Sequence, residues 1–148
     1  MAHVSMEVPA ELVGPVRETV LLLYEDTAES LHLSLRAHSE GRGSPNEPEE
    51  HRVRLAQLDE LLAQLGWRAT SRQLSAPADL LHDAFYGALI DAGERLAVTA
   101  SSSWRGELPL QRVQEAAAEV LALHRLLRLL ESLAARPYCE VEDADDAG

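Results

Sequence analysis

The chain has 148 residues, which is enough for one domain with its own core and short for two. Leu and Ala dominate with 26 and 22 copies, against ten Val and one Ile, and this composition favours helices over sheets. All 13 basic residues are Arg, and the net charge is -12. Such a charge argues against binding nucleic acid or an anionic membrane through the phosphate groups alone.

Cysteine content and hydropathy exclude further classes. Cys139 is the sole cysteine, so the chain forms no internal disulfide and no cysteine-based zinc cluster. No apolar run reaches the ~18 residues of a membrane span. Residues 1–11 lack the basic segment and apolar core of a signal peptide. We therefore expect a soluble cytoplasmic protein, and nothing in the sequence indicates a cofactor.

Prolines and glycines divide the first half of the chain. Residues 1–14 are predicted to form an N-terminal extension with a short turn. A first helix is expected from about Pro15, a residue favoured at the first helical position, to His38. The polar residues 39–48 form a loop. The spacing Asn46-x-x-Glu49 resembles a capping box and predicts the start of a second helix. This helix is expected to end at Leu65, because Gly66 is a natural C′ residue.

The second half repeats this alternation of loops and helices. Residues 67–76 are predicted to form a loop, followed by a third helix that opens around Asp79 and fades near Thr99. Pro109 opens a fourth helix, which Pro137 is expected to end. Residues 137–148 contain five acids and no base, so we expect a disordered acidic tail.

Each predicted helix carries one apolar stripe at helical spacing. Four helices with short connections favour an all-α fold, an antiparallel up-down-up-down four-helix bundle over residues 15–136. A three-helix core with one helix outside it is the alternative. No repeat is visible at the periods of about 20–50 residues that mark solenoids.

The first and fourth helices have more leucines than one stripe uses. Leu22 and Leu33 point away from the stripe of the first helix, and Leu121 and Leu129 from that of the fourth. A helix buried on one side is polar on the other, so surplus leucines indicate a second buried surface. We therefore predict an interface formed by these four residues, most simply in a homodimer. The alternative is that they are tolerated surface leucines.

A carboxylate-bridged metal site is the main chemical alternative. It would use the pairs Glu29-x-x-His32 and Asp79-x-x-His82, together with the inward-facing Glu119. Both pairs lie on the flanks of their helices, whereas the ligands of a core site share the apolar stripe. Spacings of this kind also arise by chance in a chain with 25 acids and six histidines. Metal binding therefore ranks below the interface.

Two histidines lie closer to the expected core. His38 ends the first helix and His51 begins the second, so both are expected at one end of the bundle, near Trp104. We interpret them as residues that cap the core, and a small pH-sensitive or ligand-binding pocket is the alternative.

No catalytic motif is present. Cys139 lies beside an acid that raises the pKa of a thiol, and Ser101–Ser103 form a predicted connector with no base near them in the sequence. The arginines and tryptophans of the loops do not form one surface in an antiparallel bundle, which argues against nucleic acid. We therefore expect a non-catalytic helical interaction or regulatory module that binds a second copy or another protein. The alternative is a metal- or small-ligand-binding bundle, which includes the possibility of an enzyme.

Overall fold

The structure is a computed structural model that describes the backbone of residues 3–147 and the side chains of residues 3–135. In chain order its elements are β1 (His3–Val8), α1 (Ala10–Ser39), α2 (Glu47–Leu65), β2 (Arg72–Pro77), α3 (Ala78–Trp104) and α4 (Leu110–Ala147). The disorder predicted for residues 137–148 concerns residues whose side chains lie outside this description, so it stays a prediction.

The four predicted helices are confirmed, but three of their bounds differ from the prediction. Helix α1 begins at Ala10 and not at Pro15, which lies inside it. Leu12 and Val13 are buried in the first turns, and their burial outweighs the backbone hydrogen bond that Pro15 cannot donate. Helix α3 continues through Ser101–Ser103 to Trp104, and helix α4 continues past Pro137 to Ala147, so the ends predicted near Thr99 and at Pro137 are wrong.

A two-stranded sheet accompanies the helices, so the fold is mostly helical and not purely all-α. Strand β1 lies in the region expected as an extension, and β2 lies in the expected loop 67–76. The strands are antiparallel, with Met6 opposite Leu74 and Ser5 opposite Ser75. Alternate side chains point inward, and those of Val4, Met6, Val8, Leu74 and Ala76 are buried.

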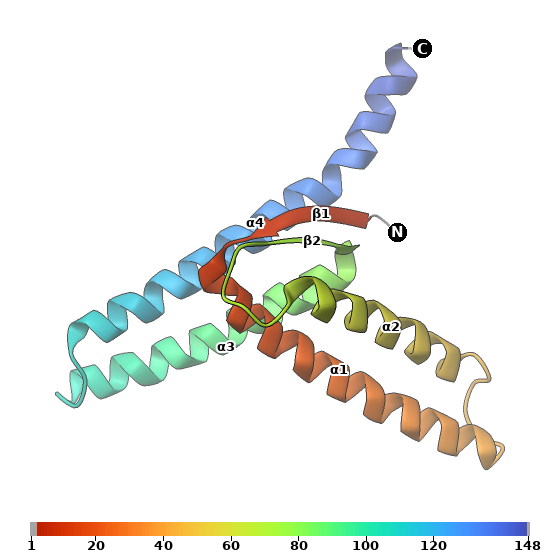
Figure 1. Cartoon of the computed structure of the whole chain (residues 1–148), viewed down its shortest axis with the longest axis horizontal. Helices are drawn as coiled ribbons and strands as arrows, with labels where there is room; N and C mark the ends of the chain where they lie inside the picture. Colours follow the sequence, from red (N-terminus) through yellow and green to blue (C-terminus); the bar gives the residue numbers. More distant parts are fainter. Residues whose placement is uncertain (1–2, 148) are drawn as a thin grey trace.

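The helices form two hairpins. Helices α1 and α2 pack on each other, as do α3 and α4, and the two hairpins diverge like the arms of a V below the sheet (Figure 1). A single up-down-up-down bundle is not confirmed, because α2 makes at most marginal contact with α3 and α4. In such a bundle each helix packs along two neighbours. Here the sheet takes that role, since β2 packs on α2 and β1 packs on α4.

The two halves of the chain are equivalent. Val8-Pro9-Ala10-Glu11-Leu12 joins β1 to α1, and Ala76-Pro77-Ala78-Asp79-Leu80 joins β2 to α3 in the same way. The buried or half-buried Leu58, Leu61, Leu62 and Leu65 of α2 have the same spacing as Leu123, Leu126, Leu127 and Leu130 of α4. One strand–helix–helix unit therefore occurs twice in the chain. The unit is longer than the repeats that mark solenoids, for which the sequence showed no signal.

Two contacts join equivalent residues and so mark a quasi-two-fold axis. Met6 and Leu74 hold the same position in their strands and are paired directly in the sheet. Thr19 and Gly87 hold the same position in α1 and α3, and a Cβ atom added to Gly87 would lie 2.6 Å from Cγ2 of Thr19. The helices therefore cross on the axis, and Gly87 permits their close approach.

The crossing predicts that Gly87→Ala destabilises the fold. The added methyl group overlaps Thr19, at a cost of about 1–3 kcal/mol, which exceeds the gain of about 1 kcal/mol that Ala brings to an exposed helix position. Thr19→Ser removes only the colliding Cγ2, so Gly87→Ala becomes neutral or stabilising in that background. Urea unfolding of the two single variants and the double variant measures this coupling.

Gly93→Ala is the matched control. It lies on the same helix, and an added Cβ meets no atom within 4 Å. It is therefore expected to be neutral or stabilising in both backgrounds. If Gly87→Ala changes the stability equally in the wild type and in the Thr19→Ser background, the close packing at the crossing is contradicted.

Candidate interaction surface

The outer face of α4 lies beside the end of β1. Leu123 and Leu130 turn into the core, whereas Leu121 and Leu129 lie off that face and are 56% and 47% exposed. Leu121, Arg125 and Leu129 follow each other at a spacing of four residues, so they form one line along the helix. Two of the four predicted interface leucines therefore share one exposed stripe.

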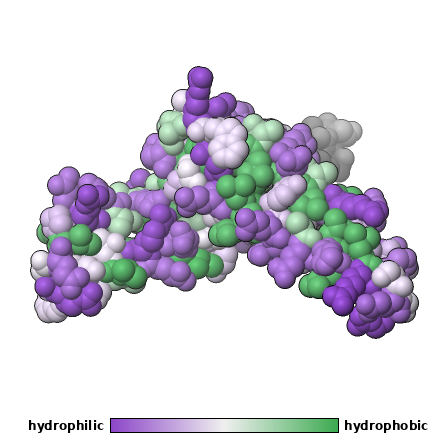
Figure 2. Space-filling view, turned by 60° about the horizontal axis from the view of Figure 1, so that its bottom comes forward, coloured by the Kyte–Doolittle hydropathy of each residue, from purple (hydrophilic) through white to green (hydrophobic). Residues whose placement is uncertain are grey.

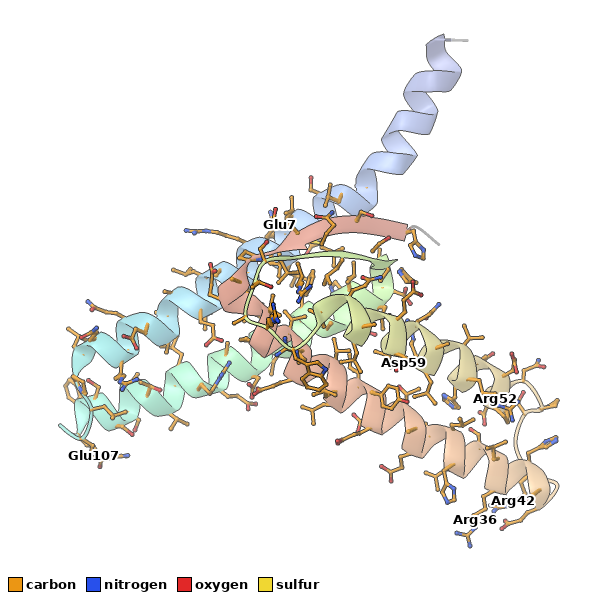
Figure 3. The ribbon with its side chains drawn as sticks, viewed as in Figure 1. Glu7, Arg36, Arg42, Arg52, Asp59 and Glu107 are labelled. Atoms are coloured by element: carbon orange, nitrogen blue, oxygen red, sulfur yellow. The ribbon has the colours of Figure 1, made fainter. Side chains whose placement is uncertain are left out.

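An open groove of about 290 Å³ adjoins this stripe. Strand β1 contributes Glu7 to the groove, at the position labelled in Figure 3, and α4 contributes Arg125 and Leu129. The remaining lining residues are Pro9, Glu11, Leu12, Ala122 and Leu126. The lining is therefore mostly apolar and contains one base and two acids.

The equivalent face of α2 differs in chemistry. Ala56 stands at the position of Leu121, and Gln64 at the position of Leu129. The side chain of Gln64 binds the outer edge of β2: Oε1 accepts the N–H of Ser75 at 2.8 Å, and Nε2 donates to its C=O at 3.0 Å. The same fold thus forms without leucine at either position, so the core does not require Leu121 and Leu129.

The free edge of β1 is a consequence of this difference. Ser75 points its N–H and C=O away from β1, so the opposite residue, Ser5, points its own backbone groups away from β2. By the same alternation His3 and Glu7 also point outward. Within residues 3–135, no hydrogen bond reaches the outward backbone groups of these three residues. Leu129 cannot supply the bonds that Gln64 supplies to β2.

The two predicted leucines on α1 are also exposed, Leu22 by 61% and Leu33 by 55%. Leu22 is equivalent to Ile90 of α3, which is 48% exposed, and each follows the crossing residue of its helix by three positions. Apolar surface is exposed where the hairpins meet, while polar residues dominate the tips of both arms (Figure 2). Both halves have an exposed apolar residue at the Leu22 position. This position therefore does not differ between the halves in the way that the outer faces of α2 and α4 do.

The predicted metal ligands are not brought together. Asp79 binds Arg54 at 2.7 Å, and Glu119 binds Arg95 at 3.2 Å. His82 is exposed and stacks on Tyr86, with 5.7 Å between the ring centroids. Glu29 and His32 are exposed on α1. Among the residues with described side chains, no three His, Cys, Asp or Glu form a group that could hold a metal ion.

The pair of histidines near a tryptophan is not found either. His38 and His51 lie at the tip of the first hairpin, whereas Trp104 ends α3 at the tip of the second (Figure 1). His38 is exposed and His51 half-buried. The prediction that Trp104 lies near these histidines is wrong, because the hairpins diverge and their tips point apart.

Arg54 and Asp79 line an open cleft of about 510 Å³, together with His3, Glu49 and Glu50. The Arg54 guanidinium, which donates to the carboxylate, holds the pKa of Asp79 below its ordinary value of 3.8. The equivalent cleft of the other half has a volume of about 420 Å³. It is lined by Glu11 at the position of Asp79 and by Glu119 at the position of Arg54. The ion pair between α2 and α3 therefore has no counterpart in that half.

The comparisons with known proteins give no further guide to this surface. No family model, curated protein or solved structure matches the chain. Of the helices in the described part of the chain, none is both long and apolar enough to cross a membrane.

The ion pair predicts a pH-dependent effect of Asp79→Asn. Since the folded pKa is lowered, Asp79 stabilises the fold fully above 3.8, and this stabilisation is lost as the pH falls through the folded value. Both side chains are partly exposed, at 32% for Arg54 and 39% for Asp79, so the loss at neutral pH is only about 0.5 kcal/mol.

Urea unfolding of Asp79→Asn against the wild type at neutral and acidic pH tests this. Asp83→Asn is the control, since Asp83 lies in the same helix end without an ion pair among the described residues. A deficit for Asp79→Asn that persists unchanged below the folded pKa would show that the ion pair is not its cause.

Proposed function

We propose that this chain is a non-catalytic protein-interaction module that forms a homodimer through the outer face of α4. The observation that carries the proposal is the contrast between equivalent positions of the two halves. Where α2 has Ala56 and Gln64, α4 has the exposed Leu121 and Leu129. Since the fold does not need these leucines, a second surface that buries them accounts for their presence.

The charges beside the leucines favour a second copy as the partner. The whole chain carries a net charge of -12, which opposes self-association at long range. At the groove, however, Arg125 lines the same surface as Glu7 and Glu11, so acids and a base occur within one patch. A copy of the same patch related by two-fold symmetry brings bases as well as acids to the contact.

The proposal predicts that Leu129→Glu dissociates the dimer. Burial of a leucine side chain contributes about 1.5–3 kcal/mol, so its replacement by a charge weakens the dimer at least about tenfold. Light scattering coupled to size-exclusion chromatography measures the mass of each variant over a range of concentrations. Circular dichroism checks that the helices remain folded.

Leu110→Glu is the matched control. Leu110 is 66% exposed at the first turn of α4, away from the groove, and receives the same substitution. It is expected to leave the dimer unchanged. A wild-type chain that stays monomeric at every concentration, or equal loss of the dimer in both variants, would overturn the proposal.

A further inference from the structure

We propose that β1 pairs edge to edge with β1 of a second copy of this chain, antiparallel, in the register that places Ser5 opposite Ser5 of the partner subunit. This inference rests on the proposed function, because it names the contact through which the dimer forms. It starts from the outward backbone groups of His3, Ser5 and Glu7, which no hydrogen bond reaches within residues 3–135. Such an edge is a ready template for another strand.

The alternation along β1 limits the possible registers. Only His3, Ser5 and Glu7 offer outward N–H and C=O groups, so these three residues must face one another across the junction. Pairing Ser5 with its own copy uses all three from each chain. A shift of two residues in one direction brings in Pro9, which has no N–H to donate, and a shift in the other direction moves Glu7 beyond β1 of the partner subunit. The self-paired register therefore forms the most hydrogen bonds.

The side chains complement each other in the same register. His3 lies opposite Glu7 of the partner subunit, and the two-fold axis creates this pair twice on the exposed face of the sheet. Ser71 donates a hydrogen bond to Oε1 of Glu7, which leaves Oε2 available to an imidazole N–H. Cross-strand pairs of unlike charge stabilise a sheet, whereas like charges directly opposite destabilise it.

The surface beneath the edge fits a second copy as well. Leu129 lines the groove together with Glu7, so it lies beside the edge of β1 as Gln64 lies beside the edge of β2. A strand added to β1 therefore covers Leu129. Helix α4 packs on the inner face of the sheet next to β1, so pairing of the strands also brings the two α4 helices toward each other. One contact thus accounts for both the free edge and the exposed leucine.

Disulfide trapping tests the register. In a Cys139→Ser background, Ser5→Cys is expected to form a disulfide-linked dimer on mild oxidation. Directly opposite residues have Cα atoms about 5.5 Å apart, which is within the range of a disulfide. His3→Cys alone and Glu7→Cys alone are expected to stay unlinked, since like residues are roughly 13 Å apart along the strands. A mixture of His3→Cys and Glu7→Cys is expected to link. Ser75→Cys, on the same exposed face of β2, is the unlinked control.

Proline substitution tests the edge without a cross-link. Ser5→Pro removes an outward N–H that makes no bond within the described part of the chain, so the fold is retained and the dimer is lost. Gln73→Pro makes the same change at the equivalent position of β2 and is expected to keep the dimer. Thermal melts followed by circular dichroism confirm that both variants fold.

The outcomes separate this inference from the proposed function. A wild-type monomer at every concentration overturns both. A dimer that Leu129→Glu dissociates, but that Ser5→Cys does not trap and Ser5→Pro does not affect, overturns the β1 pairing and leaves the α4 interface standing. If the His3→Cys variant alone forms a disulfide-linked dimer efficiently, the register that pairs Ser5 with Ser5 is overturned. Trapping of Ser5→Cys, together with linking only in the His3→Cys and Glu7→Cys mixture, supports the inference.

Discussion

The close approach of α1 and α3 at Thr19 and Gly87 determines the shape of the molecule. The two helices approach most closely on the quasi-two-fold axis and then separate, so beyond the crossing each packs mainly on its hairpin partner. The buried residues of α1 reflect this geometry, because they lie between Leu12 and Val20, with Ser34 alone farther along. The core is therefore compact around the axis, and each arm is only two helices thick.

The duplicated unit shows how one backbone can carry two chemistries. Arg54 joins α2 to Asp79 at the start of α3, whereas the equivalent positions in the other half hold Glu119 and Glu11. Glu119 binds Arg95 of its own hairpin instead. The core leucines of α2 and α4 keep the same spacing in both halves, whereas the buried Phe85 of α3 corresponds to Arg17 of α1. The positions at the rim of the sheet differ, and these form the surface that we propose to be functional.

The sequence predicted the helices well and their arrangement poorly. Composition and apolar spacing indicated four helices, and α2 ends at Leu65, as Gly66 indicated. Local spacing does not reveal that α1 and α3 cross, because this depends on a missing side chain at Gly87 that matters only when Thr19 faces it. Without the crossing, the simplest packing of four helices is a bundle, in which the two hairpins lie side by side.

The strands could have been found from the sequence. Val4, Met6 and Val8 alternate with polar residues over six positions, as in a half-buried strand, but the segment lies before a predicted helix and resembled an extension. Strand β2 gave a weaker signal, since only Leu74 and Ala76 mark its inner face. The leucine surplus on α4 was visible from spacing alone. Its place beside the edge of β1 was not, because residues distant in sequence meet there.

The covered edge of β2 has a consequence for the size of any assembly. A ribbon built from two equivalent strands has two equivalent edges, and if both were open, each copy could add another at either side without end. Gln64 occupies one edge at Ser75, and Pro77 offers no N–H there. Only one side of the ribbon can then be extended, so growth through the sheet stops at a closed pair and does not continue into a fibre.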